Sequence, residues 1–175
     1  MDRIISDIRQ LLKQHADPQA RESARNFFKE EIKLYGVKTD TVRRIAREFF
    51  KPLKGIAKAE VFGLCDELWR SGYMEESFIA CAWSYFLHKD YEPRDLKVFA
   101  RWVEKYVSNW AACDTLCNHT VGAFIQMYPA YVTELKNWAR SKNRWTRRAA
   151  AVSLIVPAKR GGFLRDICAL ADILL

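Results

Sequence analysis

Apolar residues recur at spacings of three and four along almost the whole chain. Ile4, Ile5, Ile8, Leu11 and Leu12 form one such series near the N-terminus. This period is that of an amphipathic α-helix with one buried face, and the strict alternation typical of half-buried strands is nearly absent. The hydrophobic pattern therefore predicts an all-α protein.

Turn-forming residues divide this pattern into about nine helices of roughly 10 to 20 residues with short links. Asp17 before Pro18 predicts an N-cap and a first-turn proline, and Asn143 predicts a second N-cap. Gly36 predicts the end of a helix. Short helices with tight links favour either stacked antiparallel pairs or a compact bundle. A sequence repeat would indicate stacked pairs, but segments that end a helix with an aromatic residue recur only weakly along the chain.

Length and composition narrow the class of protein. The chain has 175 residues, half of them apolar, which predicts a single soluble domain over residues 1–175 with its own hydrophobic core. Its five cysteines are unclustered and follow no secretory leader, which indicates a reducing, cytoplasmic compartment. No segment reaches the roughly 20 uncharged apolar residues that a membrane-spanning helix needs.

The net charge of +8 is concentrated in one segment. Residues 1–135 hold 20 Lys and Arg against 19 Asp and Glu, whereas residues 136–165 hold nine against none. A solvated basic face is the plain alternative, but a face built for solubility normally mixes both signs. The absence of acidic residues therefore favours a binding surface for a polyanion.

Residues 108–119 (SNWAACDTLCNH) hold the first candidate for chemistry. Trp110 and Asp114 are spaced i, i+4, so on a helix an indole and a carboxylate lie side by side. Such a pair attracts a cation through charge and through the face of the ring. The alternative is that Trp110 is a core residue and that Asp114 caps a helix beginning at Thr115.

Residues 141–150 (SKNRWTRRAA) predict a helix that starts with Arg144, Arg147 and Arg148 close to its N-terminus. The helix dipole disfavours cations there, so another interaction must offset this cost. Phosphate groups suit both guanidinium forks and helix N-terminal amides. The alternative is again a solvated surface.

The sequence offers little support for a metal site, nucleotide hydrolysis or acyl transfer. Cys113, Cys117 and His119 lie close in sequence, but a structural zinc site needs four ligands and no second Cys or His pair has suitable spacing. No glycine-rich phosphate loop and no Ser-His-Asp pattern occurs. These absences argue against a metal site, nucleotide hydrolysis and acyl transfer.

The chain resembles the HEAT-repeat DNA alkylation-repair glycosylases, the AlkD-like family of alkylpurine DNA glycosylases. Three blocks carry the resemblance, namely residues 33–49 (KLYGVKTDTVRRIAREF), 108–122 (SNWAACDTLCNHTVG) and 141–155 (SKNRWTRRAAAVSLI). The resemblance implies a right-handed α-α superhelix of HEAT-like or armadillo-like helical repeats. It also implies a monomer that needs no cofactor and that acts on double-stranded DNA containing alkylated purines.

The resemblance further implies roles for individual residues. Asp114 becomes the catalytic carboxylate with Trp110 beside it, and Arg148 contacts the DNA backbone. The other residues expected to bind DNA are Arg147, Arg144, Lys142 and Trp145. Family members continue for about one more helical repeat, which adds an aromatic residue to the site, so the ending at Leu175 predicts a truncated or shortened member.

The function expected from the sequence is hydrolysis of the N-glycosidic bond of cationic N3- or N7-alkylated purines in duplex DNA. A DNA-binding relative without catalysis is the first alternative. A helical-repeat adaptor that binds other proteins is the second, because such solenoids also grip peptides. The steepness of the salt dependence of binding distinguishes DNA from an apolar partner.

Overall fold

The computed structural model describes residues 2–175, and the chain divides into two compact units. Unit 1 comprises residues 1–87 and unit 2 comprises residues 88–175. The described residues form helices joined by turns, and an isolated bridge between Lys33 and Tyr73 is their only β-type pairing. The prediction of an all-α protein is confirmed, while the single domain over residues 1–175 stays a prediction.

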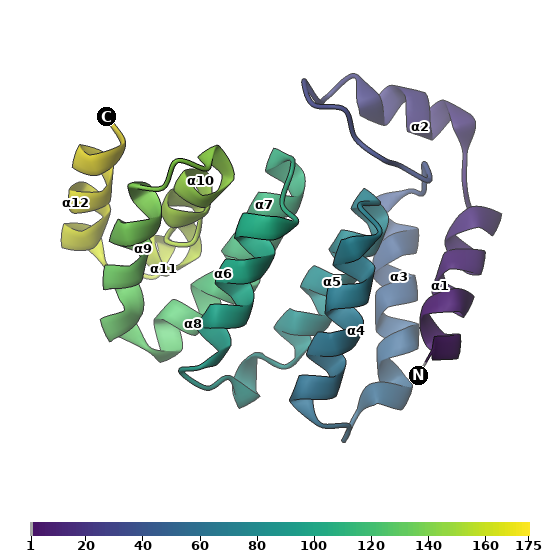
Figure 1. The fold of residues 1–175 in the computed structure, drawn as a ribbon, viewed down its shortest axis with the longest axis horizontal. Coiled ribbons are helices and arrows are strands. Elements are labelled where there is room, and N and C mark those ends of the chain that lie inside the picture. Colours follow the sequence, from purple (N-terminus) through teal and green to yellow (C-terminus); the bar gives the residue numbers. More distant parts are fainter. Residues whose placement is uncertain (1) are drawn as a thin grey trace. The chain divides into compact units, whose positions relative to one another are not determined.

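Unit 1 is built from five α-helices and a short 3₁₀ turn in its described part (Figure 1). The elements are α1 (Asp2–Gln14), α2 (Pro18–Arg25), α3 (Thr39–Phe50), η1 (Lys51–Leu53), α4 (Lys58–Arg70) and α5 (Met74–Phe86). As predicted, α2 begins at Pro18, and the Asp17 side chain accepts hydrogen bonds from the backbone N–H groups of Gln19 and Ala20.

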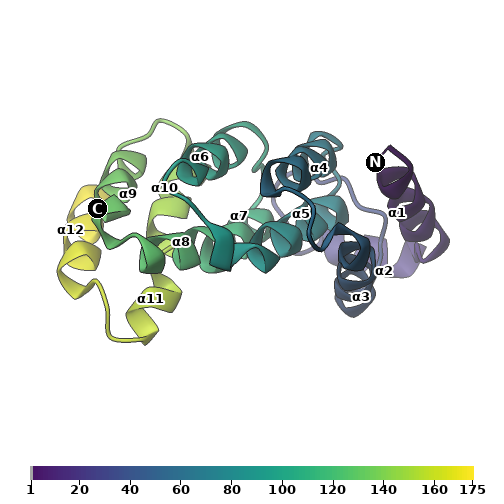
Figure 2. The same cartoon turned by 90° about the horizontal axis from the view of Figure 1, so that it is seen from below.

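Unit 2 contains seven α-helices, with a π-helical turn between two of them (Figures 1 and 2). They are α6 (Asp95–Lys105), α7 (Trp110–Leu116), α8 (Gly122–Met127), α9 (Val132–Ala139), α10 (Arg144–Val152), α11 (Ile155–Lys159) and α12 (Leu164–Leu174). The shorter elements are η2 (His88–Asp90), the π-helix η3 (Cys117–Val121) and η4 (Pro129–Tyr131). The described helices are thus shorter and more numerous than the sequence predicted.

Large buried aromatic side chains hold the helices of each unit together. In unit 1, α4 and α5 form a tight antiparallel pair, and the buried Trp83 donates its indole N–H to the carbonyl of Ala46 on α3 at 2.8 Å. In unit 2, Phe99, Trp102 and Phe124 are fully buried and contact one another in tilted or edge-to-face pairs. Such pairs add specific geometry to the burial of apolar area.

The segment around Gly36 differs from its prediction. No helix ends there, because residues 29–38 form an irregular, mostly extended segment. Gly36 has a φ of 88°, and a Cβ built on it would lie 2.5 Å from the carbonyl oxygen of Asp17. Glycine is needed both for this backbone conformation and for the close approach of the two segments.

Two buried glutamates at the start of α5 anchor this segment. The Glu75 carboxylate accepts hydrogen bonds from the backbone N–H groups of Tyr35, Gly36 and Val37 at 2.8–3.1 Å. Glu76 is fully buried and accepts from the hydroxyl of Tyr35 at 2.7 Å. Burial and this hydrogen bond raise the pKa of Tyr35 above its ordinary value. The first block of the family resemblance therefore docks onto α5.

Candidate functional site

The first candidate pair lies on α7 in unit 2, and both alternative interpretations of it are wrong. The helix begins at Trp110, and its N-cap is Asn109, whose side chain accepts a hydrogen bond from the N–H of Ala112 at 2.9 Å. Asp114 therefore lies within the helix and does not cap it. Trp110 is 41% exposed and is not a core residue. The spacing i, i+4 places both side chains on one face of α7.

Asp114 is held by an arginine from another helix. The Arg148 guanidinium on α10 donates from Nε to Oδ1 and from Nη2 to Oδ2 of Asp114, both at 2.7 Å. The two side chains retain 42% and 27% of their exposure, so solvent and solutes can reach the pair. The hydrogen bond to Asp114 and the carboxylate charge raise the pKa of Arg148.

The start of α10 follows the sequence prediction. Asn143 is the N-cap, and its side chain accepts from the N–H of Trp145 at 2.8 Å. Arg147 donates to the carbonyls of Ser141 and Lys142 at 2.8 and 3.0 Å. These hydrogen bonds hold the loop before α10 against the first turns of the helix. The Arg144 guanidinium lies over the Trp145 ring, 4.5 Å from its centre.

Close contacts to backbone carbonyls hold the segment from α7 to α8 against α10. The thiol of Cys113, for which the sequence argued against a metal-binding role, donates to the carbonyl of Trp145 at 3.6 Å. The π-helix η3 follows α7, and π-turns inside helices occur frequently at functional sites. A Cβ on Gly122 would lie 3.0 Å from the carbonyl oxygen of Ser153, so a glycine allows the chain to approach closely there.

The chain matches the family model described as DNA alkylation repair enzyme over residues 8–175. It belongs to that family. A comparison with curated proteins gives no match. Family membership makes DNA the expected substrate and repair of alkylated DNA the expected role.

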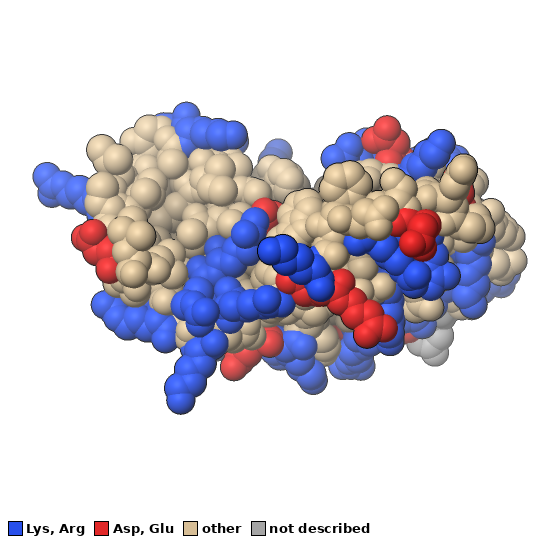
Figure 3. Space-filling model, turned by 90° about the horizontal axis from the view of Figure 1, so that it is seen from above, with Lys and Arg blue, Asp and Glu red and all other residues tan. Residues whose placement is uncertain are grey.

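The distribution of charge agrees with a DNA substrate for this family member. Unit 2 carries 14 Lys and Arg against eight Asp and Glu, whereas unit 1 carries 15 against 13. In Figure 3, basic side chains gather on the lower left over unit 2 with few acidic neighbours, while unit 1 mixes both signs. The candidate site thus lies in the more basic unit.

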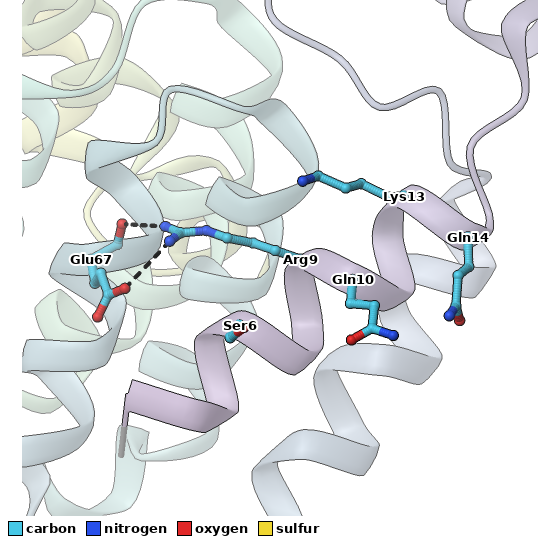
Figure 4. A pocket seen from close by; sticks show the side chains of 6 residues that line it. All are labelled: Ser6, Arg9, Gln10, Lys13, Gln14 and Glu67. Atoms are coloured by element: carbon cyan, nitrogen blue, oxygen red, sulfur yellow. Dashed lines mark hydrogen bonds and ion pairs between the residues drawn. The ribbon is translucent and has the colours of Figure 1, made fainter.

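A groove in unit 1 has a different character. Its volume is about 520 Å³, and α1 and α4 line it with Ser6, Arg9, Gln10, Lys13, Gln14 and Glu67 (Figure 4). Arg9 donates to Glu67 at 3.4 Å and to the buried Glu76 at 3.1 Å. The guanidinium of Arg9 in this groove is therefore already bound by two carboxylates of the protein.

Two features are absent from the described residues. No group of three or more His, Cys, Asp or Glu side chains in residues 2–175 is placed to hold a metal ion. No helix in the described part of the chain is long and apolar enough to cross a membrane.

Sequence reasoning found Trp110, Asp114 and the start of α10, but it missed their connection. The ion pair joins residues 34 positions apart, a separation for which helical periodicity gives no signal. Asn109 could have been found, because an asparagine directly before a helical pattern is a standard N-cap signal. The π-turn at Cys117–Val121 has no comparable signal in the sequence.

Proposed function

We propose that this protein is an alkylpurine DNA glycosylase that hydrolyses the N-glycosidic bond of cationic N3- or N7-alkylated purines in duplex DNA. The observation that carries the proposal is the exposed pair Trp110 and Asp114 on one face of α7. Membership in the DNA alkylation repair enzyme family supports it.

Hydrolysis of this N-glycosidic bond requires mainly a carboxylate positioned near the sugar. A purine alkylated at N3 or N7 carries a positive charge, so it leaves with the electrons of the C1′–N bond and becomes neutral. The sugar becomes an oxocarbenium ion, water adds to C1′, and one proton is released to solvent. A carboxylate stabilises the cationic sugar through charge, and an aromatic face adds a cation–π contribution of roughly 0.5 to 2 kcal/mol. In this proposal Asp114 and Trp110 supply these two interactions, and no cofactor takes part.

The ion pair with Arg148 suggests how DNA prepares the site. In the protein alone both carboxylate oxygens of Asp114 accept from Arg148. A phosphate of the DNA backbone competes for this guanidinium, because bidentate arginine–phosphate pairs match arginine–carboxylate pairs in geometry. Since the pair is partly exposed, the exchange needs no opening of the core. Arg148 then binds the backbone, and Asp114 becomes available to the sugar.

The neighbouring cations complete the proposed contact surface. Arg144, Trp145 and Lys142 lie at or just before the start of α10, next to the helix N-terminal amides that favour anions. Arg147 holds the loop in place through its two carbonyl contacts, and in the proposal it also adds positive charge near the phosphates.

The test is release of methylated purines from alkylated duplex DNA under single-turnover conditions, for the wild type and for Asp114→Asn. The matched control is Asp166→Asn. Asp166 is also in unit 2, is also 27% exposed, and forms an ion pair with Lys136 at 2.8 Å. We expect release by the wild type and by the control, and loss of release in Asp114→Asn. No release by the wild type contradicts the proposal.

A second candidate function is DNA binding without catalysis. The observation in its favour is that Arg148 occupies both oxygens of Asp114. If this pair persists on DNA, the wild type binds methylated duplex tightly and releases no base. Binding and release measured on the same duplex therefore separate the two functions.

A further inference from the structure

The 15 Lys and Arg of unit 1 nearly balance its 13 Asp and Glu, but these charges are not evenly placed. Residues 43–58 hold six Lys and Arg and a single acidic residue, Glu48. This segment forms most of α3, the η1 turn and the start of α4. Unit 1 therefore carries a local excess of positive charge that a count over residues 1–135 conceals.

Helix geometry gathers these cations into one stripe. Arg44 and Arg47 lie on α3, Lys51 begins the η1 turn that directly follows α3, and Lys54 follows η1. Their spacing of three, four and three residues favours one side of this helical segment. All four are exposed. At about 1.5 Å per residue the stripe is roughly 15 Å long. We call these four residues the α3 stripe.

Most of the α3 stripe is free of internal partners. Lys51 forms an ion pair with Glu48 at 2.7 Å, and the adjacent Arg43 pairs with Asp40 at 3.2 Å. The side chains of Arg44, Arg47 and Lys54 make no hydrogen bond or ion pair with any described residue. Lys51, with Arg44 and Arg47 close by, lowers the pKa of Glu48. Glu48 therefore pairs with only one of the four cations of the α3 stripe, and Arg44, Arg47 and Lys54 have no carboxylate partner within residues 2–175.

Other arginines of unit 1 behave differently. Arg9 pairs with Glu76 and Glu67, Arg3 with Asp7 and Arg25 with Glu22. These cations are balanced by carboxylates of the same unit. Like charges at spacings of three and four repel each other, so the α3 stripe carries a cost that an anionic partner would remove.

We propose that the α3 stripe is a second phosphate-binding site, which holds the backbone of duplex DNA. Its length of roughly 15 Å is enough for contact with more than one phosphate of the same strand. The contacts position the DNA and read no sequence.

A membrane surface is the other anionic partner that a basic helix can bind. Helices that lie on membranes expose an apolar face for insertion between the lipids. The apolar face of α3 is instead buried in unit 1, where Val42, Ile45 and Ala46 are at most 2% exposed. The main apolar face of α3 therefore packs into the core and is not presented to lipid, so the charge pattern favours nucleic acid.

The inference rests on the proposed function, because it assumes that the protein binds duplex DNA. The experiment compares the wild type with the triple variant Arg44→Ala, Arg47→Ala and Lys54→Ala. The control variant is Arg3→Ala, Lys13→Ala and Arg25→Ala, which removes the same charge from exposed positions on α1 and α2. Affinity for unmodified duplex DNA is measured over a range of salt concentrations, and circular dichroism confirms that both variants fold.

Each phosphate contact contributes about 0.9 to the slope of log K against log salt concentration. We expect the stripe variant to lose about 2 to 3 from the slope and to bind roughly 10- to 100-fold more weakly near physiological salt, while the control keeps the wild-type slope. Base release at saturating protein should persist in the stripe variant, since Asp114 and Trp110 are unchanged.

Three results overturn the inference. If wild type and stripe variant share one slope while the wild type releases methylated bases, the stripe assignment fails and the proposed function stands. If the variant keeps its DNA slope but loses binding to phosphatidylserine vesicles, the stripe belongs to a membrane. If the wild type neither binds duplex DNA nor releases bases, the proposed function fails and the stripe assignment fails with it.

Discussion

Each unit contains an arginine that forms an ion pair with a carboxylate on another helix, and the two ion pairs differ in how deeply the carboxylate is buried. In unit 1, Arg9 on α1 binds Glu76 on α5, and the Glu76 side chain is 0% exposed. In unit 2, Arg148 on α10 binds Asp114 on α7, and both side chains are partly exposed. The interactions are chemically alike, but only in the second is the carboxylate exposed to solvent.

This difference separates a structural pair from a functional one. A buried charge that loses its partner has no water to replace it, so breaking such a pair is strongly destabilising. An exposed pair contributes little to stability because water and ions compensate each charge. The protein can therefore open the Asp114–Arg148 pair on DNA at small cost, whereas the Arg9–Glu76 pair has to stay closed.

Arg9→Met should have the largest effect on folding. The change leaves the carboxylate of Glu76, which is 0% exposed, without its charge partner. We expect the free energy of unfolding to fall by about 3 to 5 kcal/mol, measured by urea denaturation. Glu67→Gln is the matched control, because Glu67 also binds Arg9 but is 41% exposed, and it should cost at most about 1 kcal/mol. Equal losses in both variants would contradict the distinction by burial.

Gly122→Ala should have an intermediate effect. The added methyl would lie 3.0 Å from the carbonyl oxygen of Ser153, so the chain must shift where α8 meets the end of α10. We expect a loss of about 1 to 3 kcal/mol in thermal or urea unfolding. Gly63→Ala serves as the control, since a Cβ at Gly63 meets no atom within 4 Å and alanine favours the interior of α4. A stable Gly122→Ala protein would show that the two segments have room to separate.

Arg148→Ala should change binding more than folding. Removing one phosphate contact should weaken binding to duplex DNA roughly tenfold near physiological salt and lower the salt slope by about 1. The preference for methylated over unmodified duplex should persist, because a backbone contact does not read bases. Fluorescence anisotropy over a salt series measures both quantities. Wild-type affinity in this variant would remove Arg148 from the DNA surface.

The local features of the fold followed from the sequence to a large extent. The period of apolar residues gave the helices, and Asp17 and Asn143 marked the two helix starts that they cap. Gly36 misled the prediction, because glycine ends helices but also allows close approach in extended segments. Which of the two applies depends on Asp17, which is distant in sequence.

The candidate site was predictable in its members and unpredictable in its geometry. The i, i+4 spacing placed Trp110 beside Asp114, and the absence of acidic residues marked the start of α10. The contact between Asp114 and Arg148 depends on how two helices pack, which local patterns do not encode. Glu75 and Glu76 look like ordinary first-turn acids of a helix, so their burial was equally hidden.

The most direct test of the account measures folding and chemistry on the same preparation of Asp114→Asn. Urea unfolding reports stability, and single-turnover release of methylated purines from duplex DNA reports chemistry. We expect the free energy of unfolding to change by at most about 1 kcal/mol and base release to fall roughly 100- to 1,000-fold. Release at the wild-type rate from a folded Asp114→Asn protein would contradict the account, because Asp114 would then take no part in the reaction.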